Sequence, residues 1–346
     1  MSGHQQYLRV CKVTFEGGGK ELDVSQMRVR FDTHQKDLST PHYVNIYISN
    51  LSKDTVKPLL SKEYKEVTLA AGYEASAGVI FKGEILQVRV FRESVTDIVT
   101  HVLATSAQRA RNFAIVNKSL AAGHTFRDRV DVAVEALKQY GVQVGHIDDL
   151  GSKKFPRGFA CFGMAKDLLR EVCFATNSSW HINNGTFNLV KNDGTLPGDV
   201  TVINAGTGMV WLPEQTINGI VVRCLLNYKL RPAQKIKLDN STILQAAYDP
   251  GYLGAPNNNL FSSGGLSLSA DGIYKVLLVE HNGDTRGPNW YTELACVKAD
   301  GGYSPALISR GIGDYEETGG FNPATGSYGT PTGDPPNSNT GRGGPR

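Results

Sequence analysis

Apolar and polar residues alternate with a period of two in segments spread over most of this 346-residue chain. In Met27–Thr33 the apolar residues Met27, Val29 and Phe31 are separated by charged residues, and Tyr43–Ile48 has the same pattern. Successive side chains of a β-strand point to opposite faces, so this period predicts strands that are buried on one face only. The pattern therefore indicates a mainly β protein.

Further strands are expected in seven segments: Val67–Ala71, Val79–Arg92, Asp97–Ala104, Gly219–Leu226, Lys235–Leu238, Ile273–His281 and Trp290–Val297. Short polar turns separate the members of two pairs, which predicts two long β-hairpins over Val79–Ala104 and Ile273–Val297. Tyr248–Ser269 is rich in Asn, Gly and Ser and is expected to be a long loop.

The middle of the chain has helical signals. Thr125, with Asp128 three residues later, is typical of a helix N-terminus, and Gly141 is a stop signal. A second helix is expected to start near Gly163, followed by a small hairpin that turns at Asn184-Gly185. We therefore expect a mainly β fold with a helix-containing insert, an α+β arrangement.

Glycine is concentrated at the C-terminal end. The last 46 residues contain 12 of the 38 glycines and six of the 15 prolines, which predicts a folded body followed by a Gly/Pro-rich tail. The formal net charge is only +3, and there is no apolar segment of membrane-spanning length. We expect no membrane insertion and no bulk attraction to nucleic acid.

Residue patterns for catalysis and metal binding are weak. The run Gly17-Gly18-Gly19-Lys20 lacks the spacing of a phosphate loop and is expected to be a hairpin turn. The eight histidines form no metal-ligand motif, and the five cysteines form no CxxC pair, so reduced thiols, no metal and no cofactor are expected. Cys161, just before a helix, leaves a cysteine hydrolase as one alternative. We otherwise expect no catalytic residues and no enzymatic activity.

One polar cluster, Glu280-His281-Asn282-Gly283-Asp284-Thr285-Arg286-Gly287, combines a carboxylate, an imidazole and a guanidinium. Asn, Gly and Asp are common in turns, so it is expected to be a structured hairpin turn. Asp284 and Arg286 would then hydrogen-bond locally or to a neighbouring subunit.

The order of elements suggests an internal duplication. A short element at Lys57–Tyr64 precedes strand Val67–Ala71 and the first long hairpin, and Leu225–Pro232 precedes strand Lys235–Leu238 and the second. Two related β domains that flank the insert would explain this order, but any two β domains could share it, and both explanations stay open.

Several strings together resemble bacteriophage baseplate hub (tail-tip hub) proteins over about residues 7–298. They are Asn50–Thr55, Val67–Glu74, Gly78–Ile85, Pro213–Thr216, Gly219–Asn227, Gly272–Val276, His281–Gly287 and Trp290-Tyr291. The resemblance implies two tail-tube-like β-barrel domains. The domains expected are residues 1–115 (first barrel), 116–205 (insert), 206–300 (second barrel) and 301–346 (tail).

The resemblance also implies a structural virion protein of the tail baseplate, assembled in the host cytoplasm. Three copies would form a ring that adapts the sixfold tail tube to the threefold central spike, with a channel for passage of genomic DNA. The expected partners are further copies of the chain, the tail tube or tube-initiator protein, the central spike protein and other baseplate proteins. Candidate contacts to subunits or partners are Asp284, Arg286, Trp290, Arg223, Tyr315 and Phe321.

A β-rich carbohydrate-binding or adhesin-type module remains the alternative from a different functional class. An exposed aromatic cluster and monomeric behaviour would favour it.

Overall fold

The computed structural model describes residues 6–216, 219–239, 243–245 and 272–299, and the backbone at 321–322 and 327–328. Residues 1–304 and 305–346 form two compact units. In the second unit, strands β20 (Phe321–Asn322) and β21 (Ser327–Tyr328) pair antiparallel. The expected loop Tyr248–Ser269 lies outside the described residues.

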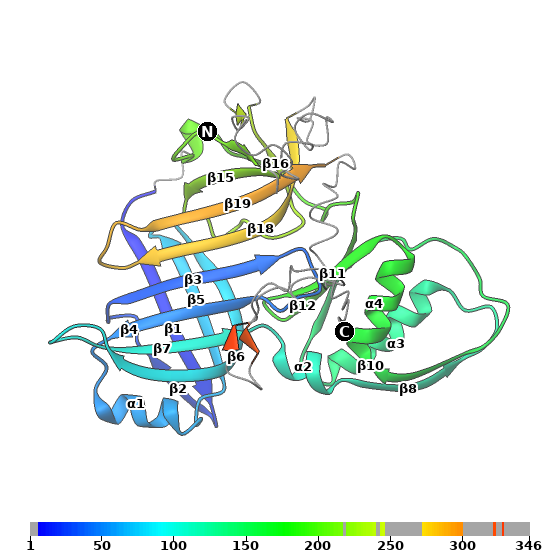
Figure 1. Ribbon diagram of the computed structural model, residues 1–346, viewed down its shortest axis with the longest axis horizontal. Coiled ribbons are helices and arrows are strands. Elements are labelled where there is room, and N and C mark those ends of the chain that lie inside the picture. The colour runs from blue at the N-terminus through cyan, green and yellow to red at the C-terminus, as the bar shows by residue number, and fades with distance from the viewer. Residues whose placement is uncertain are drawn as a thin grey trace, which may run out of the picture. The chain divides into compact units, whose positions relative to one another are not determined.

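Fourteen strands of the first unit belong to one hydrogen-bonded sheet (Figure 1). Its N-terminal lobe contains one helix, α1 (Lys53–Leu60), and seven strands: β1 (Arg9–Gly17), β2 (Lys20–Asp23), β3 (Val29–Lys36), β4 (Tyr43–Ser49), β5 (Glu66–Tyr73), β6 (Ser76–Arg92) and β7 (Ile98–Thr105). Their spatial order is β3-β4-β7-β6-β5-β1-β2. The mainly β prediction is confirmed, as is the first long hairpin, which is β6–β7.

Strand β6 changes partners half-way along its length. Its first half pairs with β5 as far as Glu84, and its second half, from Glu84 to Arg92, pairs with β7. The sheet bends at such a strand, and β1 and β5 lie behind β3, β4 and β7 at a steep angle (Figure 1). The two layers enclose one apolar core that includes Phe15, Phe31 and Phe81.

The C-terminal lobe has the strands β13 (Thr201–Val202), β14 (Glu214–Thr216), β15 (Gly219–Leu225), β16 (Lys235–Lys237), β17 (Leu244–Gln245), β18 (Ile273–Asp284) and β19 (Trp290–Lys298), with a short 3₁₀ turn, η1 (Ala205–Thr207). The expected second long hairpin is β18–β19. A second apolar core, which includes Val222, Tyr274 and Leu294, lies in this lobe.

The two lobes arrange corresponding strands in the same order. In the N-terminal lobe β3, β4, β5, β6 and β7 lie in the order β3-β4-β7-β6-β5, and in the C-terminal lobe β14, β15, β16, β18 and β19 lie in the order β14-β15-β19-β18-β16. Like β6, β18 changes partners: residues 273–275 pair with β16 and residues 278–284 pair with β3. The β3–β18 pairing joins the lobes into one sheet.

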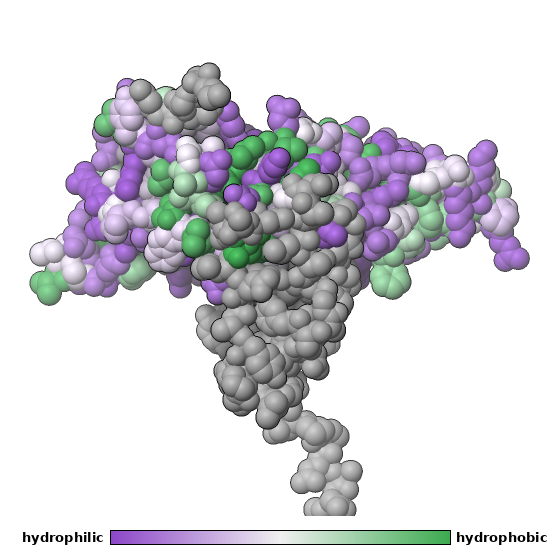
Figure 2. All heavy atoms as spheres, turned by 90° about the horizontal axis from the view of Figure 1, so that it is seen from above, coloured by the Kyte–Doolittle hydropathy of each residue, from purple (hydrophilic) through white to green (hydrophobic). Residues whose placement is uncertain are grey.

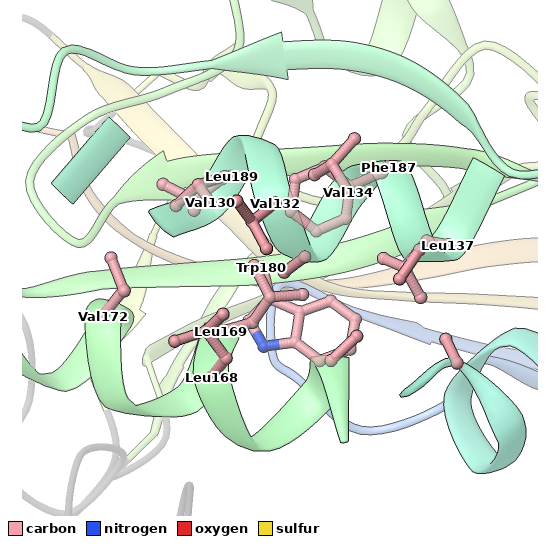
Figure 3. Close-up of a cluster of buried hydrophobic side chains, with 14 of the residues drawn as sticks. Val130, Val132, Val134, Leu137, Leu168, Leu169, Val172, Trp180, Phe187 and Leu189 are labelled. Atoms are coloured by element: carbon pink, nitrogen blue, oxygen red, sulfur yellow. The ribbon is translucent and has the colours of Figure 1, made fainter. Parts of the chain in front are cut away.

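The insert lies between the lobes in sequence. It contains three helices, α2 (Gln108–Phe113), α3 (Phe126–Lys138) and α4 (Ala165–Ala175), and five strands, β8 (Ile115–Leu120), β9 (Gln143–Ile147), β10 (Phe159–Met164), β11 (Ser178–Asn183) and β12 (Thr186–Lys191). Strands β8 and β10 form a two-stranded sheet, and β11, β12 and β9 form a three-stranded sheet. Helices α3 and α4 pack together over a third apolar core, with Trp180 near its centre (Figure 3).

Local signals in the insert are confirmed in detail. Thr125 and Asp128 form a reciprocal capping box at the start of α3. Asn184 and Gly185 both have positive φ, 49° and 83°, as the tight β11–β12 turn requires. Outside the insert, in the N-terminal lobe, the Gly18-Gly19 turn between β1 and β2 also has positive φ values, in agreement with the predicted hairpin. Strand β8 and helix α2 were not expected from the sequence.

One sequence interpretation is wrong. The cluster expected to be a hairpin turn, residues 280–287, lies mostly in strand β18, which continues to Asp284. Only residues after Asp284 form the turn. The polar character of Glu280 and Asn282 reflects a strand face that is not covered by the apolar core. Polar residues are typical of turns as well, so the residue types did not distinguish the two structures. Among the described residues, no helix has the length and apolar character needed to cross a membrane.

Candidate functional site

One face of the sheet is polar from the C-terminal lobe to the N-terminal lobe. The strands β15, β19, β18, β3, β4, β7 and β6 are consecutive neighbours, and their other face covers the apolar cores. We call this surface the polar face. Its side chains with charge or ring nitrogens include Arg223, Glu293, Glu280, His34, Asp32, Arg30, His101 and Arg89. Cross-strand register brings these residues together, because each of them lies opposite a polar or aromatic residue on a neighbouring strand.

At the C-terminal-lobe end of the polar face, Arg223 on β15 lies opposite Glu293 on β19. The Arg223 Nη2 atom lies 3.1 Å from the Glu293 Oε2 atom, and both side chains are about one-third exposed. The guanidinium also lies 5.0 Å from the ring centre of Trp211, whose side chain is exposed. Arg223 thus combines an ion pair with a surface aromatic contact, a combination compatible with its expected role at an interface.

Where the lobes meet, His34 on β3 lies between two carboxylates. Its Nδ1 atom is 2.7 Å from Glu280 Oε1 on β18, and its Nε2 atom is 3.2 Å from Asp32 Oδ2. The ring also stacks on Tyr43, with 4.4 Å between ring centres. Burial alone would lower the pKa of His34, but the hydrogen bonds to both carboxylates outweigh burial and raise the pKa to about 9. His34 is therefore a cation at neutral pH and bridges the two lobes.

A hydrogen-bond relay continues across β4, β7 and β6. Arg89 donates to His101 Nδ1 at 2.8 Å, and His101 Nε2 lies 3.0 Å from Asn45 Oδ1. Asn45 in turn donates to Asp32 at 2.7 Å. Burial and the charge of Arg89 lower the pKa of His101, which keeps this ring neutral. Arg30 pairs with Glu93 at 2.7 Å, so the charges of the polar face are largely compensated within the chain.

The turn after β18 is held by Arg9 of β1 and by Arg28, which directly precedes β3. Asp284 accepts two hydrogen bonds from Arg28, at 2.7 and 3.3 Å, and one from the backbone N–H of Arg286 at 2.9 Å. Arg9 donates to the carbonyl oxygens of Gly287 and Pro288. Burial would raise the pKa of Asp284, but the bonds from Arg28 and Arg286 outweigh it and the pKa is lowered. Asp284 therefore stays ionised and fixes the shape of the turn.

The other sequence-predicted contact residues lie in different places. Trp290 is only 1% exposed, because its ring packs in the core against Phe31 with 5.5 Å between ring centres. Its indole N–H donates to the Gly72 carbonyl at 3.2 Å, so within this chain the side chain has an internal role. Tyr315 lies outside the described residues, and Phe321 is described by its backbone in β20 only.

A buried polar junction connects all three parts of the first unit. Asp37, directly after β3, forms an ion pair with Lys275 on β18, with 2.8 Å between Oδ2 and Nζ. Asp37 also accepts a hydrogen bond from Ser179 at 2.9 Å and lies 3.1 Å from His181, both on β11. Burial would raise the pKa of Asp37, but Lys275 and His181 outweigh it and the pKa is lowered. This junction was not expected from the sequence, because its members are far apart in the chain.

Cys161 does not have the environment of a nucleophile. The residue is buried, and burial raises the pKa of its thiol, which opposes thiolate formation at neutral pH. Among the residues that the structure describes, no group of three or more His, Cys, Asp or Glu side chains is arranged to hold a metal ion.

Residues 10–247 match the model of a family described as baseplate hub gp41. The chain belongs to this family. It therefore has a structural role in the tail baseplate of a virion, and the resemblance seen in the sequence strings is confirmed. No curated protein has significant sequence similarity to the chain.

Solved structures with a similar fold include tail proteins. A tail protein from Neisseria meningitidis MC58 has 11% sequence identity and a TM-score of 0.53, with 86% of this chain and 99% of that chain covered. The prophage MuSo2 43 kDa tail protein from Shewanella oneidensis has 7% identity and a TM-score of 0.48, with coverages of 84% and 98%. At such low identity, the Neisseria structure supports the fold alone.

Proposed function

We propose that this baseplate hub protein forms a closed ring of three copies with a central channel for DNA. The ring would adapt the sixfold tail tube to the threefold central spike, without enzymatic activity. The observation that carries this proposal is the shared strand order of the two lobes. Two equivalent lobes in each of three copies supply six similar units, which is the number that a sixfold tube requires.

The duplication supports the division expected from the sequence: two tail-tube-like β-barrel domains at residues 1–115 and 206–300, an insert at 116–205 and a tail at 301–346. Each β region has its own apolar core, and the insert has a third. In this proposal, neighbouring copies contact each other through strand pairing, in the same way that β3 pairs with β18 inside one chain.

The edge of β6 is the natural place for that second contact. Residues 278–284 of β18 pair with β3, whereas the corresponding part of β6, residues 86–92, has no second strand beside it among the described residues. A groove of about 460 Å³ borders this edge, lined by Leu59 and Leu60 at the end of α1 and by Leu86 and Val88 of β6. An unpaired strand edge beside apolar side chains favours pairing with another strand. The sheet of the next copy, at its end with β14 and β17, would supply this second strand. The copies would then join head to tail.

The polar face supports the channel. Arg30, Arg223 and His34 of this face are each paired with a carboxylate of the same chain, whereas Arg89 donates to His101, so most of these cations are already compensated before DNA phosphates approach. Affinity for DNA grows with each phosphate that Lys or Arg neutralises, and a compensated surface lets DNA move. Further contacts, including those of Arg223, Arg286 and the tail, would bind the tail tube or tube initiator, the central spike and other baseplate proteins. Assembly would take place in the host cytoplasm.

The oligomeric state of the full chain tests the ring. Sedimentation at micromolar concentration is expected to give a trimer, and Val90→Lys on the β6 edge is expected to shift it to a monomer, since a charge on a strand edge blocks pairing. Val95→Lys is the matched control, because Val95 is 88% exposed in the hairpin tip beyond the strand. A wild-type chain that stays monomeric at about 100 µM, or a Val90→Lys variant that stays trimeric, would overturn the proposed seam.

A further inference from the structure

The insert contains an isolated β-ribbon made of β8 and β10. The two strands pair antiparallel from Ile115 with Met164 to Leu120 with Phe159. Neither strand has another partner among the described residues, so both outer edges of the ribbon have unpaired backbone groups. Two-stranded ribbons are marginally stable unless one face packs on a core, and here the face with Val116 and Cys161 packs on the core of the insert.

The opposite face of the ribbon exposes large apolar side chains. Phe162 on β10 is 82% exposed and Ile115 on β8 is 67% exposed. Phe113 is 61% exposed and precedes Ile115 by two residues, with the buried, extended Ala114 between them. We call Phe113, Ile115 and Phe162 the ribbon patch. Figure 2 shows hydrophobic residues at the surface on its right-hand side, where the insert lies. An exposed apolar face of this kind is typical of an interaction site.

A basic loop leads directly into the ribbon. Lys153, Lys154 and Arg157 are exposed in residues 151–158, which immediately precede β10. No acidic residue occurs between Leu150 and Phe162. The cations therefore give this end of the ribbon a positive charge that acidic residues of the same segment do not neutralise.

The loop is held in place by a buried arginine. Arg129 on α3 is 7% exposed, and its guanidinium carbon lies 4.2 Å from the ring centre of Phe155 and 3.8 Å from that of Phe159. Arg129 also donates to His124 and pairs with Glu171 at 3.1 Å. Phe155 exchanges backbone hydrogen bonds with Gly123 and His124. A pre-ordered loop loses less entropy when it binds a partner.

We propose that the β8–β10 ribbon binds an acidic, extended protein segment that adds to the sheet as a third strand. Backbone hydrogen bonds at a free edge of the ribbon would hold the segment. Every second side chain of the segment would be apolar and would pack on the ribbon patch. The carboxylates of the segment would pair with Lys153, Lys154 and Arg157. Basic and aromatic residues also suit an anionic lipid surface. A protein strand is favoured because unpaired edge groups would remain unsatisfied in hydrocarbon. This site does not depend on the ring proposed above.

The full chain can be tested with a fluorescent peptide of alternating Val and Glu. Fluorescence anisotropy is expected to show binding, with no binding of the matching Val/Lys peptide. Phe162→Ser is expected to weaken binding about tenfold, the effect of losing one buried aromatic contact. The double variant Lys154→Glu/Arg157→Glu should abolish binding at moderate salt. Hydrogen exchange should slow in residues 115–120 or 159–164 when the peptide is present.

Two exposed residues elsewhere serve as matched controls. Phe174→Ser changes a phenylalanine that is 86% exposed on the solvent face of α4, and Lys57→Glu reverses a charge on α1. Neither should alter peptide affinity. The proposal is overturned if the Val/Glu peptide does not bind at about 1 mM, if Phe162→Ser binds as well as the unmodified chain, or if phosphatidylglycerol vesicles bind through Phe162 while the peptide does not.

Discussion

Lys275 and Asp37 form an ion pair with 2.8 Å between Nζ and Oδ2, and neither side chain is more than 1% exposed. The pair connects the end of β3 with the start of β18, and Asp37 also bonds to Ser179 and His181 of the insert. The three parts of the first unit therefore meet at one carboxylate. Buried ion pairs of this kind stabilise little by themselves, but loss of one partner leaves an uncompensated charge.

Asp37→Asn is expected to lower the free energy of unfolding by about 3–5 kcal/mol, because Lys275 would remain buried without its counter-charge. Urea unfolding followed by circular dichroism measures the change. Asp54→Asn is the matched control, since Asp54 pairs with Lys57 at the surface of α1, and its effect should not be measurable. The double variant Asp37→Leu/Lys275→Met should recover much of the lost stability. A single variant as stable as the unmodified chain would contradict the central role of this junction.

The second prediction concerns alkaline pH. The pKa of His34 is about 9 in the folded chain, against 6.5 for the free side chain. Its contribution is fully present below pH 6.5 and is lost as the pH rises from 6.5 through 9, because the folded state then releases a proton that it had bound more tightly. We expect a loss of about 1–2 kcal/mol, a value reduced for solvent screening.

Urea unfolding at pH 6 and pH 8 measures most of this loss, below the range in which thiols of the unfolded chain ionise, and His34→Gln should remove most of the difference between the two values. His281→Gln is the control: burial lowers the pKa of His281 to about 3, so its titration lies on the acid side. An alkaline slope that persists in His34→Gln would contradict the bridging role of His34 between Asp32 and Glu280.

A third prediction tests packing at the end of β18. A Cβ atom added at Gly283 would lie 2.3 Å from Phe31 Cζ and 2.9 Å from Trp290 Cζ3. Gly283→Ala is therefore expected to reduce stability by about 1–3 kcal/mol, since both rings must move within a packed core. Thermal unfolding measures the effect, with Gly206→Ala as the milder control because its nearest neighbour, the Asn204 side chain, is 3.3 Å away. Equal midpoints for the two variants would show that the core tolerates the added methyl group.

Local sequence features predicted local structure well in this chain. The alternation in Met27–Thr33 corresponds to β3, and the capping residues Thr125 and Asp128 start α3. The Asn184-Gly185 turn has the positive φ angles that its residues favour. These features depend on contacts between residues close in the chain, so composition and spacing are sufficient. The polar cluster at Glu280 was misinterpreted for the same reason, since a polar strand face and a turn use the same residue types.

Long-range pairing decided the rest. His34 and Glu280 are 246 positions apart, and no spacing rule connects them. They meet because β3 and β18 pair in one register, and that register also sets the polar face and the junction at Asp37. The sequence by itself determined most of the strands, the two longer insert helices, the turns at Gly18-Gly19 and Asn184-Gly185, and the family resemblance. Only the tertiary structure decided which charges compensate one another, because electrostatic and packing energies depend on distances that the folded chain alone establishes.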